Sequence, residues 1–263
     1  MNKKIQQRLQ EDYDFLAYNG NEVVGVFLQG SQNYELDYEG SDIDTKAIVL
    51  PKFEDFVLRK KEVSETIILP SNEHIDVKDI RLMFSCFKKQ NINFVEILFT
   101  KYFILNPKYA ELYQPMFDNA ELIANYDNYA GMNTIAGMVC EKRKALSHPY
   151  PSIVDKIEKF GYDPKQLHHL VRLREFIERR ANGESFGNCL VSPQKQHLID
   201  IKRGVHTLEE AIEIGDRMLK ETDEIKKRYG EYNEKHINEE ISDFMDKVMI
   251  DIIRHRFRHE LTM

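Results

Sequence analysis

The spacing of hydrophobic and polar positions changes along the chain at about residue 79. Residues 5–16 show the apolar spacing of a helix, and short runs rich in β-branched residues, typical of strands, follow them. These expected strands are residues 23–29, 43–50, 63–69 and 74–80. A first third of this kind predicts a sheet accompanied by few helices.

From residue 79 almost to the end, apolar residues recur at helical spacing, which predicts amphipathic helices. The expected helices are residues 79–90, 129–146, 164–181, 207–229 and 237–257. Asp163 and Pro164 mark the start of one helix, and Thr207 with Glu210 forms a capping box for another. We therefore expect an α+β fold with a mixed sheet and an all-helical C-terminal portion, divided into domains at residues 1–105 and 106–263.

Composition is typical of an ordinary soluble globular protein, with 42% hydrophobic and 31% charged residues. No uninterrupted apolar stretch approaches the roughly 20 residues that a membrane span requires, and the polar N-terminus lacks an apolar signal segment. We therefore expect a cytoplasmic protein with no membrane partner. The three cysteines show no CxxC spacing and are expected to be reduced. A net charge of -7 argues against nucleic-acid binding through overall charge, although a local basic groove is compatible with it.

Residues 30–44, GSQNYELDYEGSDID, join the first two expected strands and carry the most specific chemistry. Gly30 allows the backbone to approach a ligand closely, and Ser31 is placed to begin a helix whose free N–H groups favour an anion. Ten residues separate Ser31 from Asp42. Alternation at the start of the next strand would direct the carboxylates of Asp42 and Asp44 to one face. Paired carboxylates beside a phosphate cradle predict a Mg²⁺ site, because Mg²⁺ binds through carboxylates, substrate phosphates and water.

A phosphoryl-type reaction with two metal ions also needs a third carboxylate near the acceptor hydroxyl. Asp76 is the candidate, because period-two alternation puts His74, Asp76 and Lys78 on one face of the expected strand HIDVKDI. Glu73 and Asp79 are weaker candidates, since they fall at the ends of that strand. A surface turn, or a DxD site of the kind that binds nucleotide sugars, is the alternative interpretation of the aspartate pair.

Taken together, these residues resemble the signature of the DNA polymerase β-type nucleotidyltransferase superfamily. Further stretches, QNINFVEILF, YDPKQLHHLVRL and HLIDIKRGVHTLEEA, are similar to the helical part of the YcgL-like predicted nucleotidyltransferases, so the resemblance covers most of residues 23–220. It implies a palm with a mixed sheet, an NTP substrate and two Mg²⁺ ions bound by Asp42, Asp44 and Asp76. It also implies transfer of a nucleotidyl group with loss of pyrophosphate. ATP is the expected nucleotide, and Mn²⁺ is an alternative to Mg²⁺.

The chain departs from this family pattern at two positions. Gln32 stands where members often carry Arg or a small residue, and Thr45 stands where they often carry an aliphatic residue. Neither change removes an expected metal ligand. The two departures bear on nucleotide choice and activity level.

A second group of candidate residues lies in the expected helix 164–181. Lys165, His169 and Arg172 are spaced so that they share one helix face, whereas His168 points elsewhere. The same K-x-x-x-H-x-x-R pattern is part of the resemblance, which implies contacts to the triphosphate or to the leaving pyrophosphate. A solvated helix face explains the spacing equally well.

Two functional hypotheses follow from the sequence. The first is a Mg²⁺-dependent nucleotidyltransferase acting on a hydroxyl of tRNA or another RNA, of a protein, or of a small molecule. The second is a nucleotide-binding regulatory or toxin-antitoxin-like module that keeps the fold without catalysis. The presence of all three carboxylates favours the enzyme, and the three classes of acceptor stay open.

Overall fold

The computed structural model describes residues 2–38 and 40–262, which form two compact units. Unit 1 comprises Met1–Asn33, Gly40–Tyr126 and Ile237–Met263, and unit 2 comprises Tyr34–Glu39 and Asp127–His236. This division does not coincide with the predicted boundary between residues 105 and 106. Residues 106–126 belong to the unit that contains the sheet. The C-terminal helix belongs to it as well, because that helix packs against other helices of unit 1.

The sheet of unit 1 is mixed, as predicted. In the described residues it has five strands in the order β3-β4-β2-β1-β5. The strands are β1 (Glu22–Leu28), β2 (Thr45–Leu50), β3 (Ser64–Ile68), β4 (His74–Asp79) and β5 (Phe103–Leu105). β2 pairs with β4 in parallel, and the other neighbouring strands are antiparallel. The four predicted strands are confirmed, with β2 beginning two residues later than expected, and the sequence pattern missed β5.

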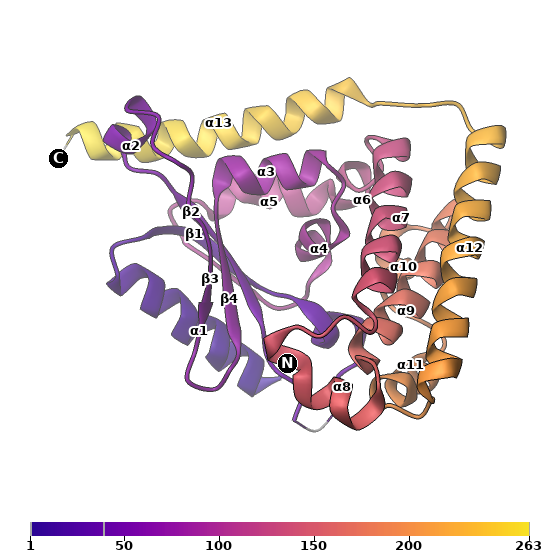
Figure 1. Ribbon diagram of the computed structural model, residues 1–263. Coiled ribbons are helices and arrows are strands. Elements are labelled where there is room, and N and C mark those ends of the chain that lie inside the picture. Colours follow the sequence, from indigo (N-terminus) through magenta and orange to yellow (C-terminus); the bar gives the residue numbers. More distant parts are fainter. Residues whose placement is uncertain (1, 39, 263) are drawn as a thin grey trace. The chain divides into compact units, whose positions relative to one another are not determined.

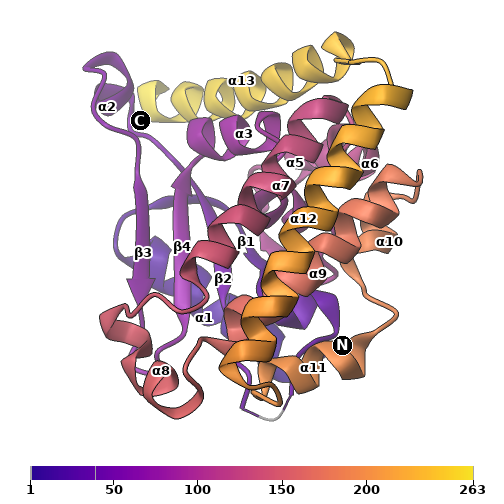
Figure 2. The same cartoon turned by 45° about the vertical axis from the view of Figure 1, so that its right-hand side comes forward.

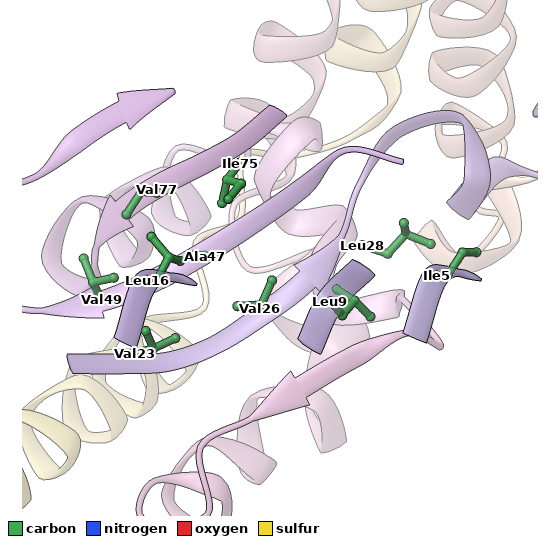
Figure 3. Close-up of a cluster of buried hydrophobic side chains, with 10 residues drawn as sticks. All are labelled: Ile5, Leu9, Leu16, Val23, Val26, Leu28, Ala47, Val49, Ile75 and Val77. Carbon is green, nitrogen blue, oxygen red and sulfur yellow. The ribbon is translucent and has the colours of Figure 1, made fainter. Parts of the chain in front are cut away.

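Helix α1 (Lys3–Tyr18) covers one face of this sheet. Figure 3 shows apolar side chains of α1 that pack against side chains of β1, β2 and β4. The cluster contains Ile5, Leu9, Leu16, Val23, Val26, Leu28, Ala47, Val49, Ile75 and Val77. On β4, buried residues alternate with half-buried ones, so Ile75 and Val77 face α1 and Asp76 faces away from it. This confirms the predicted alternation in HIDVKDI.

Helices from residues 80–123 lie on the opposite face of the sheet (Figure 1). They include α3 (Ile80–Lys88), α4 (Ile92–Val95), η2 (Glu96–Phe99), α5 (Ala110–Asp118) and α6 (Ala120–Ile123). An aromatic cluster joins β1 to α5, since the ring centroid of Phe27 lies 5.6 Å from that of Tyr113 and 6.2 Å from that of Phe117. Helix α13 (Glu239–Thr262) packs on α3, α5 and α6, and the short α2 (Phe53–Val57) contacts it through aromatic rings.

Unit 2 is helical, and its three longest helices lie side by side (Figure 2). Its helices are α7 (Asn128–Ala145), η3 (Pro151–Ile153), α8 (Val154–Phe160), α9 (Pro164–Ala181), α10 (Phe186–Leu190), α11 (Lys195–Lys202) and α12 (Leu208–Tyr232). Both predicted helix starts are confirmed. The Asp163 carboxylate accepts a hydrogen bond from the N–H of Lys165, and Thr207 and Glu210 form the reciprocal bonds of a capping box.

Two further expectations concern the chain as a whole. No helix in the described part of the chain combines the length and the apolar character that crossing a membrane requires. In the part of the chain that the structure describes, Cys86, Cys140 and Cys189 form no disulfide.

Candidate functional site

The two halves of the predicted signature lie side by side at one end of the β1–β2 pair. β1 ends at Leu28, whose register partner is Thr45, the first residue of β2. The backbone N–H of Gln29 donates a hydrogen bond of 3.0 Å to the carbonyl oxygen of Asp44, and the side chain of Gln29 donates to the carbonyl of Thr45. The Gly30-Ser31 turn, which follows directly, is therefore next to the aspartate pair although ten residues separate them.

The Gly30 turn differs from the expected phosphate cradle. Gly30 has a φ of +80°, in the region that favours glycine, and it opens a 3₁₀ helix, η1 (Gly30–Tyr34), one residue before the helix start expected at Ser31. Its N–H donates to the carboxylate of Glu96 over 3.3 Å, and Glu96 is buried. The Glu96 carboxyl group therefore already accepts from a backbone N–H of the turn that was predicted to face a phosphate. The side chain of Asn33 secures the turn by donating to the carbonyl of Leu28.

Asp42 and Asp44 lie just before β2, not within it. Asp42 is exposed and Asp44 is half-buried. One carboxylate oxygen of Asp44 accepts a hydrogen bond of 2.9 Å from the backbone N–H of His74 and lies 3.2 Å from Nδ1 of that residue. Ile43 packs against the α1 side of the sheet, so alternation directs Asp44 to the opposite side.

A buried network under α1 fixes the residues on either side of the second aspartate. The N–H of Ile43 donates to the carboxylate of Glu73 over 2.9 Å, and the hydroxyl of Thr45 donates to the carboxylate of Asp12 over 2.6 Å. Arg8 joins the two acids, at 2.9 Å from Asp12 and 2.6 Å from Glu73. Burial raises the pKa of Asp12, against the opposing effects of Thr45 and Arg8. Thr45, which departs from the family pattern, is thus the hydroxyl donor that this buried acid requires.

Asp76 is held by two lysines. The register pairs Asp76 of β4 with Lys46 of β2, and the Lys46 ammonium lies 2.7 Å from one carboxylate oxygen while the Lys78 ammonium lies 2.9 Å from the other. Burial raises the pKa of Asp76, but the two ammonium groups outweigh it and hold that pKa below its ordinary value. Burial also lowers the pKa of Lys46, which Asp76 opposes. Lys46 is 2% exposed, and its ammonium lies 4.1 Å from the ring centroid of Phe94.

The three predicted carboxylates do not form one cluster. Among the residues that the structure describes, no group of three His, Cys, Asp or Glu side chains is arranged to hold a metal ion. Asp42 and Asp44 supply oxygen donors of the kind that Mg²⁺ prefers, but the oxygens of Asp76 are engaged by lysine ammonium groups. The donor set therefore suits a divalent cation at Asp42 and Asp44 and does not present the three carboxylates of a two-ion site. The metal-binding roles stay predictions.

In unit 2, the predicted cationic face of α9 is largely covered. Lys165 is exposed, His169 is half-buried, and Arg172 is only 4% exposed. The pKa of His169 lies well below its ordinary value, because desolvation and the nearby cationic side chains disfavour its protonated form. Arg172 is therefore not part of a solvated face, and a phosphate contact stays a prediction. His168 points elsewhere, as expected, and its Nδ1–H donates to the carbonyl of Leu198 over 2.9 Å.

The covered Arg172 contacts the signature itself. Residues 34–39, within the spacer between Ser31 and Asp42, belong to unit 2. The Arg172 guanidinium lies over the ring of Tyr34, 4.0 Å from its centroid, and Lys195 pairs with Glu35. Unit 2 therefore holds the middle of the spacer, while unit 1 holds both of its ends.

Sequence reasoning did not identify the contact of Lys46 with Asp76 or the contact of Glu96 with Gly30. Lys46 and Glu96 are each a single charged residue within an apolar run, TKAIVL and NFVEILF respectively. A charged side chain in such a run is expected to be buried and therefore to have a polar or charged partner elsewhere in the chain. The identity of the partner depends on strand register and on chain packing, which the runs themselves do not specify.

An apolar groove of about 520 Å³ lies elsewhere in unit 1. It is lined by Phe53, Phe56, Arg81, Met249, Ile250, Ile253, Arg254, Phe257 and Arg258. Among the described residues that line it, none carries a carboxylate, so the groove offers no site for a divalent cation.

Comparisons with known proteins add little to this geometry. No protein-family model matches the chain, and no curated protein matches it. A solved structure described as a nucleotidyltransferase-like protein from Exiguobacterium sibiricum is similar to this chain at a TM-score of 0.29 and 11% identity, over 85% of this chain and 75% of that one. A likeness of this degree does not assign an activity.

Proposed function

We propose that this chain is a nucleotidyltransferase that moves a nucleoside monophosphate from an NTP, with ATP as the expected substrate, to a hydroxyl acceptor. The observation that carries the proposal is the hydrogen bond from the N–H of Gln29 to the carbonyl of Asp44, which brings the Gly30-Ser31 turn beside the aspartate pair. A turn that the backbone leaves open, with two carboxylates next to it, suits a triphosphate that arrives with a divalent cation.

Each residue of the site has a proposed task. Asp42 and Asp44 would hold Mg²⁺ or Mn²⁺, which supplies charge neutralisation to the phosphates when bound. The Gly30-Ser31 turn would face the β- and γ-phosphates. The acceptor hydroxyl would then attack the α-phosphorus and lose its proton to solvent water, the bond from that phosphorus to the bridging oxygen would break, and pyrophosphate would leave. The contacts of Asp44 with His74 support this role, because they orient its carboxylate before the substrate binds.

The remaining predicted residues have less support. Lys165, His169 and Arg172 stay proposed contacts to the triphosphate or pyrophosphate, and of these Lys165 is exposed to a ligand in solution. A cytoplasmic location also stays a proposal. The acceptor belongs to one of three classes, an RNA such as tRNA, a protein or a small molecule.

A second candidate function is a nucleotide-binding module that performs no transfer. Two observations favour it, because in each a group that was expected to bind substrate or metal is already bonded to another side chain. Lys46 and Lys78 engage the carboxylate of Asp76, and Glu96 accepts from the N–H of Gly30. Such a module would bind the NTP and release it unchanged.

Transfer of label from each α-³²P-labelled NTP distinguishes the two functions. The purified chain is incubated with Mg²⁺ and a cell lysate, and the products are treated with protease, with ribonuclease or with neither. The enzyme is expected to label an acceptor and release pyrophosphate, Asp44→Asn to abolish the labelling, and Asp223→Asn, on the exposed face of α12, to retain it. Binding without transfer would support the silent module, and absence of both binding and transfer would overturn the proposal.

A further inference from the structure

The Lys46–Asp76 pair lies across the parallel β2–β4 register and is largely shielded from water. Lys46 is 2% exposed, and the side chain of Asp76 is 16% exposed. Their charged atoms are 2.7 Å apart, which is the distance of a charge-assisted hydrogen bond. Withdrawal of Asp76 would leave the Lys46 ammonium buried and uncompensated, which is strongly destabilising.

Three features bind the Lys46 ammonium in place. Asp76 supplies the counter-charge, the face of the Phe94 ring lies 4.1 Å away, and the aliphatic stem runs along a fully buried strand. Lys78 adds a second ammonium 2.9 Å from Asp76. A divalent cation that approached this carboxylate would have to displace both ammonium groups and would be repelled by them.

The aspartate pair is in a different position. Asp42 is exposed, and the Asp44 carboxylate has hydrogen bonds from His74 but no ion pair with a lysine or arginine among the described residues. Because Lys46 follows Asp44 by two residues in an extended segment, the two side chains share one face of the sheet. That face therefore presents the half-buried Asp44 carboxylate and, beyond it, an acid that is already neutralised.

We propose that Asp76 is the counterion of Lys46 and not a metal ligand, so that the site binds a single divalent cation, at Asp42 and Asp44, where a three-carboxylate site would bind two. This inference rests on the proposed nucleotidyltransferase function and specifies its metal stoichiometry. Asp76 is then a positioning residue, which holds the Lys46 ammonium in its place beside β4.

Counting bound Mn²⁺ tests the stoichiometry without any turnover. The full chain is titrated with Mn²⁺ in the presence of α,β-methylene-ATP, which cannot be cleaved at the α-phosphorus, and free Mn²⁺ is measured by its electron paramagnetic resonance signal. One ion per chain is expected. Two ions per chain would overturn the inference.

Variants then assign the ligands. Asp76→Asn alone would strand the Lys46 ammonium and can unfold the chain, so the informative variant is the double substitution Lys46→Gln with Asp76→Asn, which replaces the ion pair by a pair of amides. Circular dichroism and a thermal melt establish that it is folded. The double variant is expected to keep one Mn²⁺ per chain at nearly unchanged affinity, whereas Asp44→Asn is expected to lose it.

The outcomes separate this inference from the function on which it rests. If the double variant no longer binds Mn²⁺, Asp76 is a ligand and the inference is wrong while the proposed function stands. If the wild-type chain binds the nucleotide analogue but no Mn²⁺, both the inference and the proposed cation site are wrong.

Discussion

At the scale of single residues, hydrogen bonds on the α1 side of the sheet hold the start of β2 in place. They involve the hydroxyl of Thr45 and the carboxylates of Asp12 and Glu73. Thr45 is fully buried and donates to Asp12, which is itself 2% exposed. Arg8 and Glu73 complete the network and hold the N–H of Ile43. Asp44 lies between the two fixed residues, so its position follows from contacts on the opposite side of the sheet.

Thr45→Val should therefore destabilise the protein although the side chain keeps its shape. The substitution removes a hydrogen bond to a buried carboxylate, which costs about 1–3 kcal/mol when the acceptor is left unsatisfied. Urea denaturation measures the change in the free energy of unfolding. Thr66→Val, on the exposed strand β3, is the matched control and should stay within about 0.5 kcal/mol of wild type. Equal stability of the two variants would show that Asp12 does not depend on Thr45.

The sequence located the aspartate pair and the glycine turn but not the partners that modify them. Alternation placed Asp76 on the correct face because it depends only on neighbouring residues of one strand. The pairing of Asp76 with Lys46 depends on the register between two strands 30 residues apart. The contact of Glu96 with Gly30 joins residues 66 positions apart and depends on how η2 packs against the end of β1. Local patterns carry no information about such partners.

At the scale of secondary-structure elements, α9 combines structural and candidate functional roles. Its start is capped by Asp163, its buried face carries His168, and Arg172 extends from it to the ring of Tyr34. Its sequence predicted the helix, its cap and the direction of His168. It did not predict that Arg172 is buried, because Tyr34 lies far away in the chain.

The burial of His168 predicts a dependence of stability on pH. Desolvation lowers the pKa of His168 to about 4, whereas an unfolded histidine has a pKa of about 6.5. Between these values the unfolded chain binds a proton that the folded chain does not, so this contribution to stability is complete above about pH 6.5 and is lost as the pH falls towards 4. The loss amounts to roughly 3 kcal/mol.

Substitution isolates this contribution from those of other titrating groups. His168→Gln keeps a donor for the carbonyl of Leu198 and should flatten the decline in unfolding free energy between pH 6.5 and pH 4. His197→Gln, at an exposed position of α11, should retain the wild-type decline. Parallel curves for His168→Gln and wild type would show that the folded chain protonates His168 normally.

The contact between α9 and the spacer can be measured as a coupling energy. A double-mutant cycle with Arg172→Met and Tyr34→Leu should give about 0.5–2 kcal/mol, because a desolvated guanidinium over a tyrosine ring is attracted by the ring face. Tyr34→Phe keeps the ring and is the control that should preserve most of the coupling. Additive effects of the two substitutions would show that the contact contributes nothing.

At the scale of the whole molecule, the sequence predicted the type of nearly every long element but not the division into units. Long periodic segments such as α7, α9 and α12 were predictable because each shows several helical turns of apolar spacing. The pattern did not show β5 and α10, whose three and five residues are too few for a clear period. Helix α13 was predicted as a helix, yet its place in unit 1 depends on distant contacts, among them the ion pair of Lys88 with Asp246 at 2.6 Å.

The most direct test of the proposed function compares ATP labelled at the α-phosphate with ATP labelled at the γ-phosphate, using the full chain, Mg²⁺ and the acceptor fraction. A nucleotidyltransferase transfers the α-label to the acceptor and releases the γ-label in pyrophosphate. We expect α-label on the acceptor, no γ-label, and loss of transfer in Asp44→Asn. Transfer of the γ-label, or α-labelling that persists undiminished in Asp44→Asn, would contradict the account.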